Sequence, residues 1–86
     1  MSKRVVKPED ITAKCAAFIA EQLQRPVASV HLDTEFDDFG LDSALVTSML
    51  IELEEWLGVE LPPSLVFEEP TVRRLSLAIS QRLLEA

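Results

Sequence analysis

The sequence has few cysteines and glycines and no tyrosine. Its 86 residues include one cysteine, two glycines and no tyrosine. A single cysteine excludes an internal disulfide and a cysteine-based metal cage, so a reducing, cytoplasmic setting is expected. The first eight residues are basic but lack an apolar segment, and no stretch approaches the length of a membrane span. Neither a secretory signal nor a membrane helix is therefore expected.

Basic residues are absent from the whole middle of the chain. Between Pro26 and Val72 there is no lysine or arginine, although this stretch holds 11 of the 15 acidic residues, and the formal net charge is −7. Such a field repels nucleic acid and attracts basic protein surfaces. A charge run is most simply a solvated face. Because these acids surround one candidate site, however, their placement favours docking of a protein partner.

Apolar residues at helical spacing predict three main helices. The first spans about Pro8 to Leu23, with Cys15 on its apolar face, and the second spans about Ser43 to Leu57. The last helix begins after Pro70, where Thr71 suits the N-cap position.

The rest of the chain predicts one short helical turn and one long loop. The turn, at 64–67, places Val66 or Phe67 in the core. The acid-rich loop, at about 27–41, is anchored by apolar residues: Val30, Leu32, Phe36 and Phe39. We therefore predict an all-α fold, a small four-helix bundle of three main helices plus one short helix. It forms a single domain, 1–86, with a folded core at about 8–84.

Ser43, where the acidic loop meets the second helix, is the candidate functional residue. A nucleophile elbow would need glycines two residues before and after the serine, and these positions hold Leu41 and Leu45. The single histidine, His31, is interpreted as an ordinary loop residue, so a serine hydrolase is disfavoured. The acids at 33–37 lack the glycine and closing glutamate of a calcium loop, and no metal site is predicted.

The residues alone leave two interpretations of Ser43 open. A serine before an apolar-periodic run is a common helix cap. If Asp42 serves as the cap instead, the Ser43 hydroxyl points outward at the helix N-terminus. A phosphodiester on that hydroxyl would be favoured there by the free backbone N–H groups and the helix dipole.

Three segments resemble acyl carrier proteins. The run Gly40-Leu41-Asp42-Ser43-Ala44 is similar to the Gly-x-Asp-Ser-Leu signature, whose serine carries 4′-phosphopantetheine. The segment 53–62 resembles the exit of the second helix in carrier domains. Residues 65–72 resemble the Leu-Val-Phe-x-x-Pro-Thr run of polyketide-synthase carriers. The segments occur in family order and spacing, and the resemblance covers about Ile11 to Leu84.

The resemblance implies a non-catalytic carrier for polyketide, lipopeptide or related lipid biosynthesis. It would hold acyl intermediates as thioesters on a 4′-phosphopantetheine arm attached to Ser43. A phosphopantetheinyl transferase would deliver the arm from coenzyme A, and Asp42 would help to position the transferase or its metal. Ala44 stands where most members have a leucine that contacts partners. The predicted partner face of the second helix consists of Ala44, Thr47, Ser48, Ile51, Glu52 and Glu55, with Glu54 also placed on the exposed side.

Further partners follow from the same resemblance. They are an acyl-activating ligase or acyltransferase and a ketosynthase or condensation partner, with no nucleic acid and no membrane. The Asp-Ser-Ala run together with Leu-Glu-x-Trp-Leu-Gly is similar to stand-alone carriers served by fatty acyl-AMP ligases. We expect a monomer; Met1 and the short ends favour a free-standing protein, and an excised domain stays open. Two alternatives remain. One is a small acidic helical adaptor without a prosthetic group, in which Ser43 is only a cap. The other is a peptidyl carrier protein of a nonribosomal peptide synthetase, although these usually read Gly-His-Ser or Gly-Asp-Ser.

Overall fold

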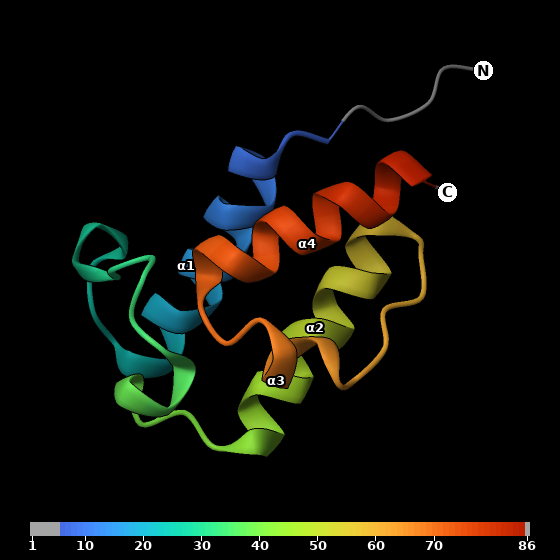
Figure 1. Cartoon of the computed structure of the whole chain (residues 1–86). Helices are drawn as coiled ribbons and strands as arrows, with labels where there is room; N and C mark the ends of the chain where they lie inside the picture. The colour runs from blue at the N-terminus through green and yellow to red at the C-terminus, as the bar shows by residue number, and fades with distance from the viewer. Residues whose placement is uncertain (1–5, 86) are drawn as a thin grey trace.

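The computed structural model describes residues 6–85, which fold into four α-helices and two short 3₁₀ helices (Figure 1). Within this range, pairing of β type is limited to an isolated bridge between Glu35 and Thr71. The elements in chain order are α1 (Pro8–Leu23), η1 (Val27–Ser29), η2 (Phe36–Phe39), α2 (Ser43–Leu57), α3 (Leu65–Glu68) and α4 (Val72–Glu85). The predicted all-α bundle of three main helices and one short helix is confirmed.

One apolar core joins the three long helices, and α1 and α4 pack along each other (Figure 1). The fully buried side chains include Ile11, Cys15 and Ile19 from α1, Met49, Leu50 and Leu53 from α2, and Val72, Leu75 and Ile79 from α4. Burial raises the pKa of the Cys15 thiol to about 12, because a thiolate is poorly solvated in an apolar interior. Cys15 is therefore a neutral core side chain.

Local chemistry accounts for the helix ends. Pro8 is the first residue of α1, and the Asp10 carboxylate accepts a hydrogen bond from the Lys7 backbone N–H at 3.0 Å. The Thr71 hydroxyl oxygen accepts from the Arg74 N–H at 3.1 Å at the start of α4, which confirms the predicted cap. Gly58 ends α2 with φ of +71°, a left-handed conformation that glycine adopts without steric cost.

The segment between α1 and α2 is ordered by pairing with the start of α4. The Phe36 N–H donates to the Pro70 carbonyl at 2.9 Å, and the Arg73 N–H donates to the Leu32 carbonyl at 3.1 Å. Val30 and Phe36 are buried, as predicted for loop anchors. The two 3₁₀ helices were not predicted, because turns of three or four residues leave no periodic pattern. This anchored segment fixes the position at which α2 begins.

Across the described part of the chain, no helix combines the length and the apolar character that crossing a bilayer requires.

Candidate functional site

Ser43 is the first residue of α2, and its neighbour Asp42 caps that helix. The Asp42 backbone is extended, and its carboxylate Oδ1 accepts a hydrogen bond from the Leu45 backbone N–H at 2.9 Å. This confirms the interpretation in which Asp42 provides the cap. The Ser43 side chain is exposed and makes no hydrogen bond to any residue of the described range 6–85. Its hydroxyl is therefore available for chemistry without loss of the helix start.

A tight turn before α2 gives Ser43 this position. Gly40 has φ of +82°, and its N–H donates to the Asp37 carbonyl at 2.9 Å. The Leu41 N–H then donates to the Phe36 carbonyl at 3.4 Å, and the Leu41 side chain is buried. The chain thus turns at Gly40, which adopts positive φ without steric cost, and the buried Leu41 side chain anchors the turn to the core. Asp42 and Ser43 follow at the surface.

A cavity of about 220 Å³ lies beside Ser43, between the start of α2, α3 and the end of the long loop. Its lining is Glu35, Phe36, Asp37, Leu41, Ser43, Val46, Val66, Phe67 and Pro70. The lining combines apolar side chains with acidic groups at the edge. A phosphate-linked group on Ser43 fits this site, because the hydroxyl is exposed at the positive end of a helix and has free space next to it.

The long loop and its flanks carry the negative charge. The structure places two ion pairs among the described residues: Arg73 with Asp33 at 2.7 Å and Arg74 with Glu69 at 3.0 Å. The first lowers the pKa of Asp33, chiefly through the hydrogen bond from Arg73. Asp37 and Glu35, which line the cavity beside Ser43, take part in neither of these ion pairs.

The site contains no arrangement for catalysis by Ser43. His31 is exposed and does not line the cavity beside Ser43. Within residues 6–85, no three His, Cys, Asp or Glu side chains come together as a metal site would require. The described residues therefore place no histidine beside Ser43, and the neighbouring Asp42 carboxylate is engaged as the cap of α2.

The residues of the predicted partner face lie along α2 from Ser43. Ile51, an aliphatic side chain, is 46% exposed, as predicted. Ala44, Ser48, Glu52 and Glu55 are exposed as well, and Thr47 is half-buried. Ile51 is thus an exposed apolar side chain among short polar and acidic ones, the kind of surface that solvent alone does not require.

Glu54 does not belong to the exposed side on which the sequence placed it. It is half-buried, and its carboxylate accepts a hydrogen bond from the Leu61 backbone N–H at 2.7 Å. The helical pattern alone could not show this, because the acceptor satisfies a backbone group in the turn that follows α2. Glu54 therefore has a structural role in holding residues 58–61 against the helix.

The place of Phe67 beside Ser43 was not predicted, because the sequence pattern allows either Val66 or Phe67 to enter the core. Val66 is buried, whereas Phe67 is 64% exposed and lines the cavity beside Ser43. Two adjacent apolar residues in a four-residue helix point in different directions, and their order in the sequence does not reveal which one is inside. Phe67 adds a large apolar surface on the α3 side of Ser43.

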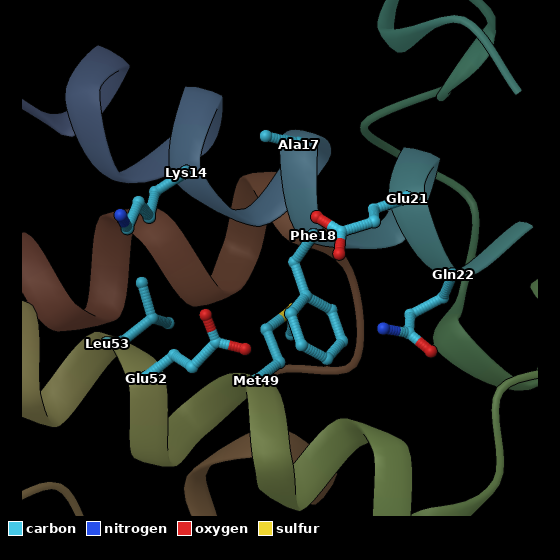
Figure 2. Close-up of a pocket in the computed structure, with 8 residues that line it drawn as sticks. All are labelled: Lys14, Ala17, Phe18, Glu21, Gln22, Met49, Glu52 and Leu53. Atoms are coloured by element: carbon cyan, nitrogen blue, oxygen red, sulfur yellow. The ribbon is translucent and has the colours of Figure 1, made fainter. Parts of the chain in front are cut away.

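A second hollow, of about 170 Å³, lies between α1 and α2 (Figure 2). The figure shows Phe18 and Met49 close together, while Lys14 and Glu52 extend into the same space from opposite helices. The Lys14 ammonium also lies 5.4 Å from the centre of the Trp56 ring, within the range of a cation–π contact. Ser43 does not line this hollow, whereas Glu52 of the predicted partner face does.

Comparison with known proteins identifies relatives of this chain. Residues 16–79 match the family described as "Phosphopantetheine attachment site". The chain is 30% identical over 77 residues to the acyl carrier protein TtuC of Teredinibacter turnerae, covering 90% of this chain and 88% of TtuC. It is 42% identical over 55 residues to the erythronolide synthase EryA3 of Saccharopolyspora erythraea. That match covers 64% of this chain but only 2% of the much longer synthase.

Solved structures of carrier proteins have the same fold as this chain. An acyl carrier protein of Anabaena with a variant phosphopantetheinylation-site sequence, Asl1650, superimposes with a TM-score of 0.85 at 29% identity. That match covers 95% of this chain and 93% of Asl1650. A free-standing peptidyl carrier protein from Acinetobacter baumannii superimposes with a TM-score of 0.82 at 25% identity, covering 90% of this chain and 96% of that protein.

Proposed function

Because this chain belongs to the phosphopantetheine-attachment family of non-catalytic carrier proteins, we propose that it carries acyl intermediates on a 4′-phosphopantetheine arm attached to Ser43. The observation that carries the proposal is the division of roles at the start of α2. Asp42 caps the helix, and the Ser43 hydroxyl is exposed beside it. If Ser43 were the cap instead, its oxygen would point at the backbone N–H groups of α2 and would be less accessible to a transferase.

The chain itself supplies one reactive atom in the loading step. Oγ of Ser43 forms a bond to the phosphorus that bears the pantetheine group of coenzyme A. The pyrophosphate P–O bond of that phosphorus breaks, adenosine 3′,5′-bisphosphate departs, and a base takes the hydroxyl proton. The base is proposed to belong to the transferase, since no histidine lines the cavity beside Ser43 and the Asp42 carboxylate is engaged as the helix cap. Once bound, the arm supplies a terminal thiol that holds the acyl group as a thioester. Asp42 is proposed to help orient the transferase or its metal, because its carboxylate is the acidic group next to the reacting hydroxyl.

The partner face and Phe67 are proposed as the docking surface around Ser43. Phe67 on α3 is exposed and lines the cavity beside Ser43, and Ile51 is exposed about two turns further along α2. Exposed acids such as Glu52 and Glu55 surround Ile51 and favour partners with basic surfaces. Each exposed ion pair contributes roughly 0–1 kcal/mol. Such weak contacts suit a carrier that must bind several enzymes in turn and leave each of them.

An acyl cargo in polyketide or related lipid biosynthesis is proposed over a peptidyl cargo. The similarity to TtuC and to polyketide synthases supports this choice, while the likeness to the Acinetobacter protein keeps a peptidyl carrier as the second candidate. The proposed partners beyond the transferase are an acyl-activating ligase, of the fatty acyl-AMP type, or an acyltransferase, together with a ketosynthase or condensation enzyme. We propose that the carrier acts as a monomer in the cytoplasm, where coenzyme A is available.

Incubation with coenzyme A and a broad-specificity phosphopantetheinyl transferase tests the proposal. The intact mass is expected to rise by one phosphopantetheinyl group in the wild type and in Ser64→Ala, a control at another exposed serine. Ser43→Ala is expected to gain nothing. Absence of a mass change in the wild type, under conditions that load other carriers, would contradict the proposed function.

A further inference from the structure

The hollow between α1 and α2 that Figure 2 shows has an apolar floor. Met49 and Leu53, both buried, and Phe18, which is half-buried, contribute apolar side chains to its lining. Its volume is about 170 Å³, whereas pockets for drug-sized ligands begin at roughly 300 Å³. The space therefore suits a single side chain of another protein better than a cofactor.

Two carboxylates stand at the edge of this hollow. Glu21 and Glu52 are exposed, and Figure 2 shows them turned toward the Phe18 ring from α1 and α2. Neither takes part in the two ion pairs found among the described residues. Lys14, the other charged residue of the lining, has its ammonium 5.4 Å from the centre of the Trp56 ring, and Trp56 itself does not line the hollow. The hollow thus combines an aromatic ring with two carboxylates and one ammonium that already contacts an aromatic ring.

We propose that this hollow receives an arginine side chain of a partner enzyme, with the guanidinium stacked on the Phe18 ring and bound to the carboxylates of Glu21 and Glu52. A guanidinium is planar, presents five donors, stacks on aromatic faces and is more weakly hydrated than an ammonium, so it fits this lining better than a lysine does. A purely apolar side chain would desolvate the carboxylates without pairing them.

The charge of the whole chain favours the same occupant. The formal net charge is −7, which attracts basic protein surfaces. The inference deepens the proposed docking surface by adding Phe18 and Glu21 of α1 to it. It rests on the proposed function only in taking a partner enzyme as the source of the arginine.

Three capped amino acids serve as probes. They are Nα-acetyl-arginine N-methylamide, its lysine counterpart, and its citrulline counterpart, in which a neutral urea group replaces the guanidinium. Titration into the ¹⁵N-labelled protein without an arm is expected to shift the amide resonances of Phe18, Gln22 and Glu52. The arginine probe should bind roughly 3- to 10-fold more tightly than the citrulline probe, the range for two exposed ion pairs. It should also bind more tightly than the lysine probe, which carries the same charge and therefore matches the ionic strength.

Substitutions in the lining separate the contributions. Glu21→Gln and Glu52→Gln should each weaken binding of the arginine probe by about 2- to 5-fold. Lys14→Gln removes the competing ammonium and should strengthen it. Phe18→Leu keeps an apolar side chain but no ring, so it should remove the preference for arginine over lysine. Glu9→Gln, at an exposed position of α1 outside the hollow, is the matched control and should leave binding unchanged.

Four results would overturn the inference. They are no binding of the arginine probe, equal binding of the citrulline probe, shifts that cluster away from the hollow, and shifts at the hollow when the protein alone is concentrated, which would assign the site to a second copy of the chain. Ser43→Ala should give the same titrations as the wild type, so none of these results bears on the loading of Ser43.

Discussion

The Asp42 carboxylate accepts a hydrogen bond from the Leu45 backbone N–H at 2.9 Å and thereby caps α2. Ser43 lies between these two residues in the chain and has no part in the bond. The helix therefore starts correctly whatever the Ser43 hydroxyl carries. This arrangement explains how a serine at a helix start can serve as a modification site, where sequence patterns alone suggest a cap.

Removal of the Asp42 carboxylate should weaken the fold. Asp42→Ala is expected to lower the free energy of unfolding by about 1 kcal/mol, the usual cost of a lost N-cap. Asp42→Asn keeps a capping oxygen and should stay close to the wild type in urea denaturation. If Asp42 also orients the transferase, Asn at this position should load coenzyme A more slowly than the wild type at equal stability. Equal loading rates would limit Asp42 to capping.

Removal of the Ser43 hydroxyl should leave stability almost unchanged. Ser43→Ala is expected to alter the free energy of unfolding by less than about 0.5 kcal/mol, as for other exposed positions without a structural contact. The adaptor hypothesis, in which Ser43 is the cap, predicts a loss of about 1 kcal/mol with partner binding intact. Urea denaturation of both proteins, with loading measured in parallel, separates the two accounts.

Glu54 and Glu55 should behave differently despite being neighbours of the same type. Glu54→Ala leaves the Leu61 N–H without its charged acceptor, and a loss of about 1–3 kcal/mol is expected. Glu55→Ala, at an exposed position, should change stability by less than about 0.5 kcal/mol. Thermal and urea unfolding of the pair provide the measurement. Equal losses in both variants would contradict the structural role given to Glu54.

Apolar truncations around Ser43 should affect partner enzymes and spare the fold. Ile51→Ala and Phe67→Ala are expected to reduce the kcat/KM for loading, because both side chains are exposed and belong to the proposed docking surface. Leu84→Ala, a strongly exposed position at the end of α4, should load at the wild-type rate. Added salt should slow loading further, since it screens the acids of the partner face. A rate unaffected by either truncation would remove Ile51 and Phe67 from the docking surface.

Cys15 should be unreactive in the folded protein. Its pKa is raised to about 12 by burial, so the thiol stays protonated and enclosed at pH 8. Iodoacetamide is therefore expected to add no label to the folded protein before loading and one label, on the arm, after loading. The Cys15 thiol ionises more easily in the unfolded chain than in the folded protein. The free energy of unfolding should therefore fall as the pH rises above 9.0, the ordinary pKa of the thiol. Labelling of Cys15 in the native protein would show that α1 opens.

The sequence predicted those features that depend on periodicity and on local chemistry. The apolar stripes gave the bounds of α1 and α2 as found, Pro70 and Thr71 marked the start of α4, and the exposure of Ile51 followed from its place on the helix. These features succeed because the period of a helix and the chemistry of a cap lie within a few residues of each other.

Features that depend on contacts between distant segments could not be predicted. The bond from Leu61 to Glu54 and the exposure of Phe67 each result from the way separate elements pack. The sequence could not decide whether Ser43 or Asp42 caps α2 either. Both residue types are common helix caps, and only the structure shows that the Asp42 carboxylate accepts the Leu45 N–H.

Localisation of the added mass tests the central claim most directly. After incubation with coenzyme A and transferase, fragment-ion mass spectrometry of the intact protein should place one phosphopantetheinyl group on Ser43, with no other residue modified. An unmodified protein under conditions that load other carriers, or a modification at a different residue, would contradict the assignment of Ser43 as the attachment site.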